Sequence, residues 1–113
     1  MFPSRRSSDA ADISPEALKA LLDAGAAIVV DVREPHEFAA GHIPGAINLP
    51  LSQFTPADLP DAGGRKLVLN CAAGGRSAKA LASCAVARAS VHGHLAGGLG
   101  AWTAGALPIE AGA

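Results

Sequence analysis

Two apolar runs, residues 26–32 (AAIVVDV) and 66–70 (KLVLN), most constrain what this chain can fold into. Neither run alternates strictly between polar and apolar residues, so each indicates a strand that is buried on both faces. Strands of this kind belong to parallel sheets, whose neighbours are joined by crossover connections that usually contain a helix. We therefore expect an α/β fold with a largely parallel sheet.

Helix signals lie before, between and after the two apolar runs. Ser14 is a good N-cap, Pro15 suits a first helical position and Gly25 suits the end of a helix, so a helix is predicted between them. The other expected elements are helices over 35–40, 76–88 and 99–104, strands over 46–49 and 90–95, and a short surface helix or turn within 51–64.

The 113 residues suffice for one domain, which we place at 13–110 between a flexible tail over 1–12 and a short tail over 111–113. A formal net charge of −1 predicts no nucleic-acid partner. No apolar run approaches the roughly 18 residues of a membrane helix, which predicts no membrane partner. No apolar segment follows the two N-terminal arginines as in a secretory signal, so the cytoplasm is the expected location.

Cys71 provides the strongest chemical signal. It follows the run 66–70, and a loop of two alanines and two glycines separates it from Arg76 and a predicted helix. Such small residues let backbone N–H groups turn inward as an anion-binding nest, and the helix N-terminus adds positive potential. Together with Arg76, these features lower the pKa of a thiol from its usual value of about 8.5 and predict a reactive nucleophile.

Two other interpretations of this loop were weighed. Cys71 at the end of a strand would serve equally as a small buried core residue, but the glycine pair and Arg76 at this spacing favour the nucleophile. A phosphate-binding Walker loop is disfavoured because no Gly-Lys-Ser or Gly-Lys-Thr follows the glycines.

The chain resembles single-domain rhodaneses, which are sulfurtransferases. The matching segments are 31–38 (DVREPHEF), 41–46 (GHIPGA), 71–77 (CAAGGRS), and Gly97-Gly98 with Ala101-Trp102 and Gly105. The resemblance implies a rhodanese-like fold, with a central, largely parallel five-stranded sheet flanked by helices on both sides. It also implies that Cys71 takes a sulfane sulfur from a donor, forms a persulfide and passes the outer sulfur to a thiophilic acceptor.

The implied mechanism uses neither a metal nor an organic cofactor. The Cys71 thiolate attacks a small sulfur donor, backbone amides of the loop hold the negative persulfide, and a thiol, cyanide or a protein accepts the sulfur. Arg76 and Arg33 are expected to hold an anionic donor such as thiosulfate. The residues expected to bind the substrate are Ala72, Ala73, Gly74, Gly75, Arg76, Ser77 and Arg33.

Loop length separates two chemistries. Four residues lie between Cys71 and Arg76, whereas phosphatases and arsenate reductases of the related fold have five. The longer loop fits a tetrahedral oxyanion and the shorter one fits the single sulfur of a persulfide, so sulfur transfer is favoured over phosphatase-like chemistry.

Charged residues after the first apolar run have structural explanations as well. We expect Asp31 to shape the loop through an ion pair or amide hydrogen bonds, without touching the substrate. Arg33 has two interpretations, a structural role and a contact with the donor. Glu34 and Glu37 are expected to be charges at a helix N-terminus.

Other candidate residues are interpreted as structural. We expect His42 to be a turn residue satisfied by the backbone, and Cys84 and Trp102 to be core residues. A zinc site is not expected, since the spacing of the two cysteines with His92 and His94 matches no common structural site.

Two departures from the rhodanese pattern stand out. The stretch 84–94 blurs the end of a helix and a strand that Gly93 weakens. The loop also lacks a second basic residue after Cys71, which favours glutathione persulfide or a protein persulfide over thiosulfate as donor. A persulfide relay or binding module with little turnover of small molecules therefore remains the alternative to an enzyme. A catalytically silent regulatory module is disfavoured by the presence of Cys71 and Arg76.

Overall fold

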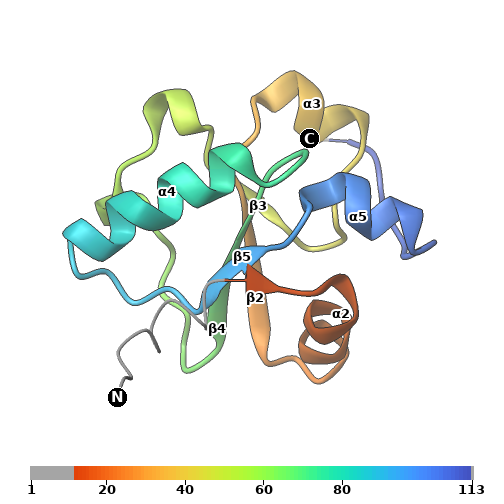
Figure 1. Cartoon of the computed structure of the whole chain (residues 1–113), viewed down its shortest axis with the longest axis horizontal. Coiled ribbons are helices and arrows are strands. Elements are labelled where there is room, and N and C mark those ends of the chain that lie inside the picture. The colour runs from red at the N-terminus through yellow and green to blue at the C-terminus, as the bar shows by residue number, and fades with distance from the viewer. Residues whose placement is uncertain (1–11, 113) are drawn as a thin grey trace, which may run out of the picture.

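The computed structural model describes residues 12–112, which form a five-stranded, all-parallel sheet with helices on both faces (Figure 1). The order of the strands in the sheet is β1-β5-β4-β2-β3. Their bounds are β1 Asp12–Ile13, β2 Ala27–Asp31, β3 Ile47–Asn48, β4 Lys66–Asn70 and β5 Gly93–Leu95. The predicted fold class and the parallel sheet are confirmed.

Four α-helices and two short 3₁₀ helices complete the described chain. Their bounds are α2 Pro15–Asp23, α3 Pro35–Ala40, α4 Gly75–Val86, α5 Gly98–Ala104, η1 Leu51–Gln53 and η2 Pro56–Asp58. Local signals explain where α2 begins, because the Ser14 hydroxyl accepts the N–H of Ala17 at 3.1 Å and Pro15 takes the first helical position.

The sheet buries a different set of residues on each face. Val29 and Val68 point toward α2 and α5, where Trp102 fills the core. Leu69 and Cys71 point to the opposite face, which α4 covers. Figure 1 shows α4 and α2 on opposite sides of the sheet. Because side chains alternate along a strand, successive residues of β4 point to opposite faces and contact different helices.

Several predicted boundaries differ from the structure. The strand β1 was not anticipated, and it begins at Asp12, within the segment interpreted as a tail; residues 1–11 lie outside the described part. The helix expected over 76–88 ends at Val86, and β5 is only three residues long. The chain leaves α4 through Arg88, whose φ is 59°, before it re-enters the sheet at Gly93.

The backbone at the start of α5 packs directly on the loop after β4. The N–H of Leu99 donates to the carbonyl of Cys71 at 2.8 Å, and that of Gly100 donates to the carbonyl of Ala72 at 2.9 Å. Gly98 has a φ of +60°, and a Cβ there would overlap the Cys71 carbonyl oxygen and lie 2.7 Å from the Ala72 carbonyl carbon. Only glycine permits this approach.

We predict that Gly98→Ala lowers the free energy of unfolding by about 3 kcal/mol or more, because it adds a backbone clash to an unfavourable φ. Gly63→Ala is the matched control, since Gly63 has a φ of +58° with nothing within 4 Å of its Cβ position. That control should lose only about 1 kcal/mol. Urea denaturation measures both, and equal losses would show that the contact with the loop contributes nothing.

Candidate active site

Cys71 lies directly after β4, at the carboxyl edge of the sheet, with its side chain on the α4 face. The residue is only 1% exposed. The loop that follows it leads into α4 through Gly74, whose φ of 110° few residues other than glycine adopt. Carboxyl ends of parallel strands are where α/β sheets bind ligands, so the thiol stands where this architecture places chemistry.

Hydrogen bonds surround the sulfur. The N–H of Gly74 points at Cys71 Sγ from 3.0 Å, and Ser77 Oγ lies 3.5 Å away. Burial is the largest influence on the thiol and opposes its ionisation. The Ser77 hydroxyl and the N–H groups of Ser77, Gly74 and Ala73 outweigh it together and hold the pKa of Cys71 below its usual value. The loop predicted as an anion-binding nest therefore stabilises a thiolate.

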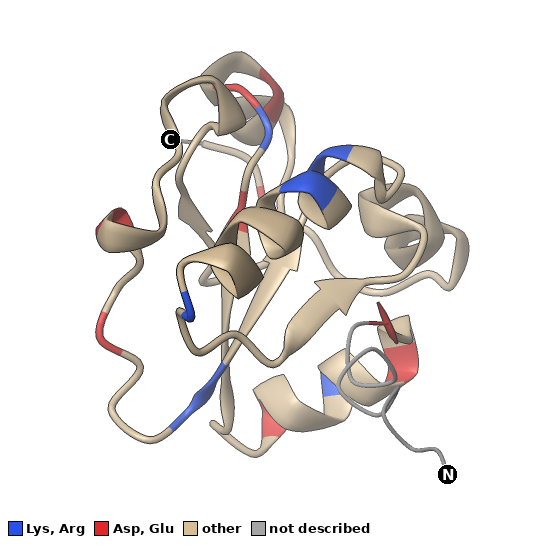
Figure 2. Cartoon of the chain, turned by 60° about the vertical axis from the view of Figure 1, so that its left-hand side comes forward, with Lys and Arg blue, Asp and Glu red and all other residues tan. Residues whose placement is uncertain are grey.

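Arg76 forms a two-pronged ion pair with Glu37 of α3. Its Nη1 and Nη2 lie 2.7 and 3.0 Å from the two carboxylate oxygens. This hydrogen bonding outweighs partial burial and lowers the pKa of Glu37 to about 2. Figure 2 shows basic residues in the first turns of α4 and acidic residues in α3. The Glu37 carboxylate thus neutralises Arg76, which the sequence analysis expected to bind an anionic donor.

Glu37 is also part of a capping box with Glu34 at the start of α3, which is the helix-terminal role predicted for both residues. The sequence did not indicate its pairing with Arg76, because 39 residues separate the two.

Arg33 and Asp31 form a buried ion pair beneath the loop. Arg33 Nη2 lies 2.8 Å from Asp31 Oδ2, Arg33 Nε lies 3.0 Å from Asp31 Oδ1, and the Arg33 backbone N–H also donates to that oxygen. The guanidinium donates further to the carbonyls of Glu37 and Gly41. Arg33 is 5% exposed, is directed at protein acceptors and has Asp31 as its partner, an arrangement that favours its structural interpretation over a contact with the donor.

A family model of the rhodanese-like domain matches residues 14–105. This chain belongs to the rhodanese-like domain family. The match spans strands β2 to β5, the Cys71 loop and α5, so four of the five strands and the loop lie within the domain that the family defines.

Individual relatives agree with the assignment. A sulfurtransferase of Allochromatium vinosum is 36% identical over 106 residues, which cover 88% of this chain and 94% of that protein. A probable adenylyltransferase/sulfurtransferase, MoeZ, of Mycobacterium tuberculosis is 41% identical over 95 residues. The crystal structure of a thiosulfate sulfurtransferase from Pseudomonas aeruginosa matches with a TM-score of 0.81 at 28% identity and covers 91% of this chain and 20% of that one.

Some relatives are much longer than the matched segment. The rhodanese-like domain spans 54% of an uncharacterised Synechocystis protein that is 46% identical to it, and 24% of MoeZ. In the described residues, no helix has the length and apolar character needed to cross a membrane.

Behind Cys71, the rhodanese-like domain contains a polar contact that the sequence analysis missed. Ser77 Oγ lies 2.8 Å from Nδ1 of His94, and His94 Nε2 lies 3.0 Å from the carboxylate of Asp12. His94 was weighed only as a zinc ligand. The available signal was its place in β5 beside the buried Leu95, since a residue next to a core leucine points to the opposite face of the sheet.

The remaining candidates occupy structural positions. His42 Nδ1 lies 2.7 Å from the carbonyl of Phe38, and Trp102 Nε1 donates to the carbonyl of Pro108 at 2.7 Å. Cys84 is buried against the α4 face of the sheet, and burial raises its pKa. No group of three or more metal-binding side chains occurs in residues 12–112.

We predict that Arg33→Met lowers the free energy of unfolding by about 3–5 kcal/mol, because it leaves the Asp31 carboxylate buried without its cation. Lys19→Met is the control: its ion pair with Asp23 is exposed, with side-chain accessibilities of 33% and 64%, and should contribute less than about 1 kcal/mol. Urea denaturation compares them. If Arg33→Met had unchanged stability and bound thiosulfate more weakly, Arg33 would instead be a residue that contacts the donor.

Proposed function

We propose that this rhodanese-like domain is a sulfurtransferase whose Cys71 holds the transferred sulfur as a persulfide. The observation on which the proposal depends is the buried thiol whose sulfur receives the Gly74 N–H at 3.0 Å within an amide-lined loop. Such a loop stabilises a thiolate before transfer and a persulfide anion during it. We expect the protein to act where both cysteines remain reduced, as in the cytoplasm.

The steps balance without a cofactor. The Cys71 thiolate attacks the sulfane sulfur of the donor, an S–S bond forms to Cys71, and the bond between that sulfur and the rest of the donor breaks. With thiosulfate the leaving group is sulfite; with glutathione persulfide it is the glutathione thiolate. A thiolate or cyanide then attacks the outer sulfur and releases the Cys71 thiolate. The N–H groups of Ala73, Gly74 and Ser77 again donate hydrogen bonds to this thiolate.

The placement of Arg76 supports sulfur transfer over phosphatase-like chemistry. An oxyanion substrate would need a guanidinium facing the cradle. Here both terminal nitrogens of Arg76 bind Glu37, and Gly74 closes the loop directly onto the sulfur. The short loop therefore fits one sulfur atom better than a tetrahedral anion.

The ion pairs of Arg33 and Arg76 also affect which sulfur donor the site can bind. Arg33 and Arg76, the two cations expected to hold thiosulfate, are both engaged by carboxylates. We therefore propose a persulfide, of glutathione or of a protein, as the preferred donor. The match to MoeZ, whose name joins adenylyltransferase and sulfurtransferase, is consistent with sulfur transfer to or from another protein.

Intact-protein mass spectrometry tests the proposal. Reduced wild-type protein should gain the mass of one sulfur atom after exposure to glutathione persulfide, and a smaller fraction should gain it from thiosulfate. Cyanide or a thiol should remove that sulfur. Cys71→Ser should gain none, while Cys84→Ser should behave as the wild type does.

Each contrary outcome has a distinct meaning. Stable labelling with slow release to small acceptors would identify a persulfide relay rather than an efficient enzyme. Equal labelling of Cys71→Ser would move the reactive thiol to Cys84. No gain from either donor would refute sulfur transfer at this loop.

We predict that Glu37→Gln strengthens the reaction with thiosulfate, lowering its KM by about threefold to tenfold, because the charge of Arg76 is no longer balanced by a carboxylate and can attract a dianion. Glutamine keeps the oxygen that accepts the Glu34 N–H, so the start of α3 is preserved. Because the pKa of Glu37 is about 2, the wild-type pair stays ionised throughout the neutral range, and the stability it contributes is lost only as the pH falls toward that value.

Glu34→Gln is the matched control for this variant. It makes the same change in net charge, but the Glu34 carboxylate accepts from Ser52 and is not paired with Arg76. Steady-state kinetics with thiosulfate should show a lower KM for Glu37→Gln only. An equal change in both variants would assign the effect to overall charge.

A further inference from the structure

A line of polar side chains runs from Cys71 to the protein surface. Ser77 Oγ stands between Cys71 Sγ at 3.5 Å and His94 Nδ1 at 2.8 Å, and His94 Nε2 contacts Asp12 Oδ1 at 3.0 Å. Ser77 is fully buried and His94 is 9% exposed, whereas the Asp12 side chain is 76% exposed. The nucleophile is therefore connected to a surface carboxylate through two buried side chains.

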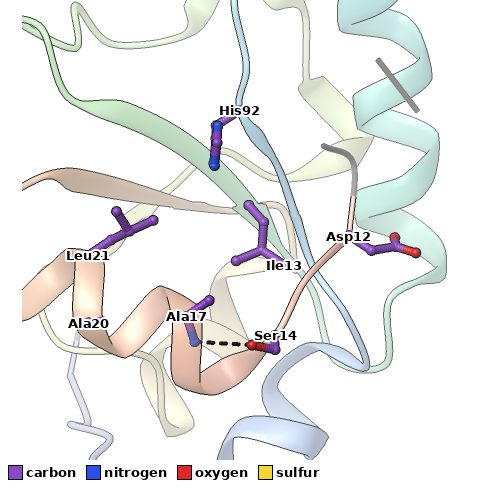
Figure 3. A pocket seen from close by; sticks show the side chains of 7 residues that line it. All are labelled: Asp12, Ile13, Ser14, Ala17, Ala20, Leu21 and His92. Atoms are coloured by element: carbon purple, nitrogen blue, oxygen red, sulfur yellow. Dashed lines mark hydrogen bonds between the residues drawn. The ribbon is translucent and has the colours of Figure 1, made fainter. Parts of the chain in front are cut away.

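The sheet itself builds this line. Asp12 and His94 are register partners across β1 and β5, so their side chains share a face. Their neighbours Ile13 and Leu95 are buried on the opposite face, with α2 and α5. Figure 3 shows the carboxylate of Asp12 directed away from Ile13. This direction is toward the face that α4 covers, where Ser77 lies in the first turn of that helix.

The chemistry of the partners determines where each proton lies. A carboxylate only accepts, so His94 donates its Nε2–H to Asp12, and Nδ1 of the neutral ring is an acceptor. The single proton of Ser77 Oγ then points to His94 at 2.8 Å. Its other acceptor, the Gly74 carbonyl, is farther away at 3.3 Å and already receives the Ala78 N–H at 3.0 Å. Ser77 consequently turns a lone pair toward the Cys71 thiol.

We propose that Ser77 and His94, anchored by Asp12, form a proton relay that ionises Cys71. The S–H bond breaks as its proton passes to Ser77 Oγ, and the original Ser77 proton passes to His94 Nδ1. The products are a thiolate that accepts a hydrogen bond from the new Ser77 O–H and an imidazolium held by Asp12. No oxidant or reductant takes part. Ser77 touches the reacting sulfur, and His94 acts through Ser77 as a positioning residue.

Polar and charged groups face His94 from the elements packed against it. On β1 it faces the Asp12 carboxylate, and on α4 it faces Ser77, through which it meets the Cys71 thiolate. Its register partner on β4 is the apolar Leu69. Of the nearby cations on α4, Arg76 is bound to Glu37 and Lys79 is exposed. Two acidic groups, the Asp12 carboxyl and the Cys71 thiol, therefore lie at the two ends of the connection through His94 and Ser77.

The relay rests on the nucleophilic role proposed for Cys71. Its test measures ionisation of the Cys71 thiol directly and does not depend on sulfur transfer. In a Cys84→Ser background, the rate of alkylation by iodoacetamide and the ultraviolet absorbance of the thiolate are followed against pH. His94→Asn keeps a polar group near Ser77 but cannot take the proton. It should slow alkylation about tenfold near neutral pH and leave it unchanged at alkaline pH, where the thiol ionises unaided.

Two further variants test the line itself. Asp12→Asn, at the exposed end, leaves folding undisturbed and should shift the profile in the same direction by a smaller amount. In a Ser77→Ala background, His94→Asn should have no further effect, since the connection is already broken. His92→Gln is the matched control and should leave the profile unchanged, because the side chain of His92 lines a pocket that shares only Asp12, the exposed end, with the line of polar side chains (Figure 3).

An unchanged pH profile in His94→Asn would overturn the relay. So would a rate lowered equally at every pH, which would assign His94 a purely structural role. If the wild type gains no sulfur from either donor while His94→Asn still shifts the alkylation profile, the relay stands and the proposed sulfur transfer fails.

Discussion

The register of the parallel strands is the constraint on which this site depends. His94 pairs with Leu69 across β5 and β4 and with Asp12 across β5 and β1. A slip of one residue in β5 would turn His94 toward α2 and expose Leu95 to the α4 side, because successive side chains point to opposite faces. Leu69 and Leu95 are fully buried on opposite faces, so their burial holds the polar residues in place. Apolar packing thus determines the face of the sheet to which His94 and Asp12 point.

The two cysteines show what decides the chemistry of a buried thiol here. Cys71 and Cys84 are each 1% exposed and belong to the same core cluster, Cys71 after β4 and Cys84 on the buried side of α4. Burial raises the pKa of Cys84, whereas hydrogen bonds overcome burial at Cys71 and lower its pKa. Equal burial therefore gives opposite results, and the difference lies in the loop that places N–H donors around one sulfur. The docking of α5 onto the Cys71 and Ala72 carbonyls holds that loop in shape.

Local signals in the sequence predicted most of the fold and the centre of the site. The cap at Ser14, the buried runs that became β2 and β4, and the glycine-rich loop after Cys71 all depend on residues close together in the chain. The strand β1 was not predictable in this way, because two residues leave no periodicity to detect and its partner lies in β5.

Long-range partners were also beyond local reasoning. Asp12 and His94 are 82 residues apart, and Glu37 and Arg76 are 39 apart. The sequence left Arg33 with two interpretations, and its burial against Asp31 and two backbone carbonyls favours the structural one. The end of α4, by contrast, is a local capping turn, in which Arg88 has a φ of 59° and the Ala89 N–H donates to the Cys84 carbonyl; the sequence did not indicate it because no glycine marks the position.

Pairing of side-chain charges then favours one kind of substrate. Arg33 is matched by Asp31 and Arg76 by Glu37, so the positive potential that remains at Cys71 comes from backbone N–H groups and the start of α4. Such partial charges stabilise one negative sulfur at short range, and they offer a dianion little attraction at a distance. A site of this kind suits the passage of a single sulfur between thiols, because the Cys71 thiolate and the persulfide anion each carry one negative charge.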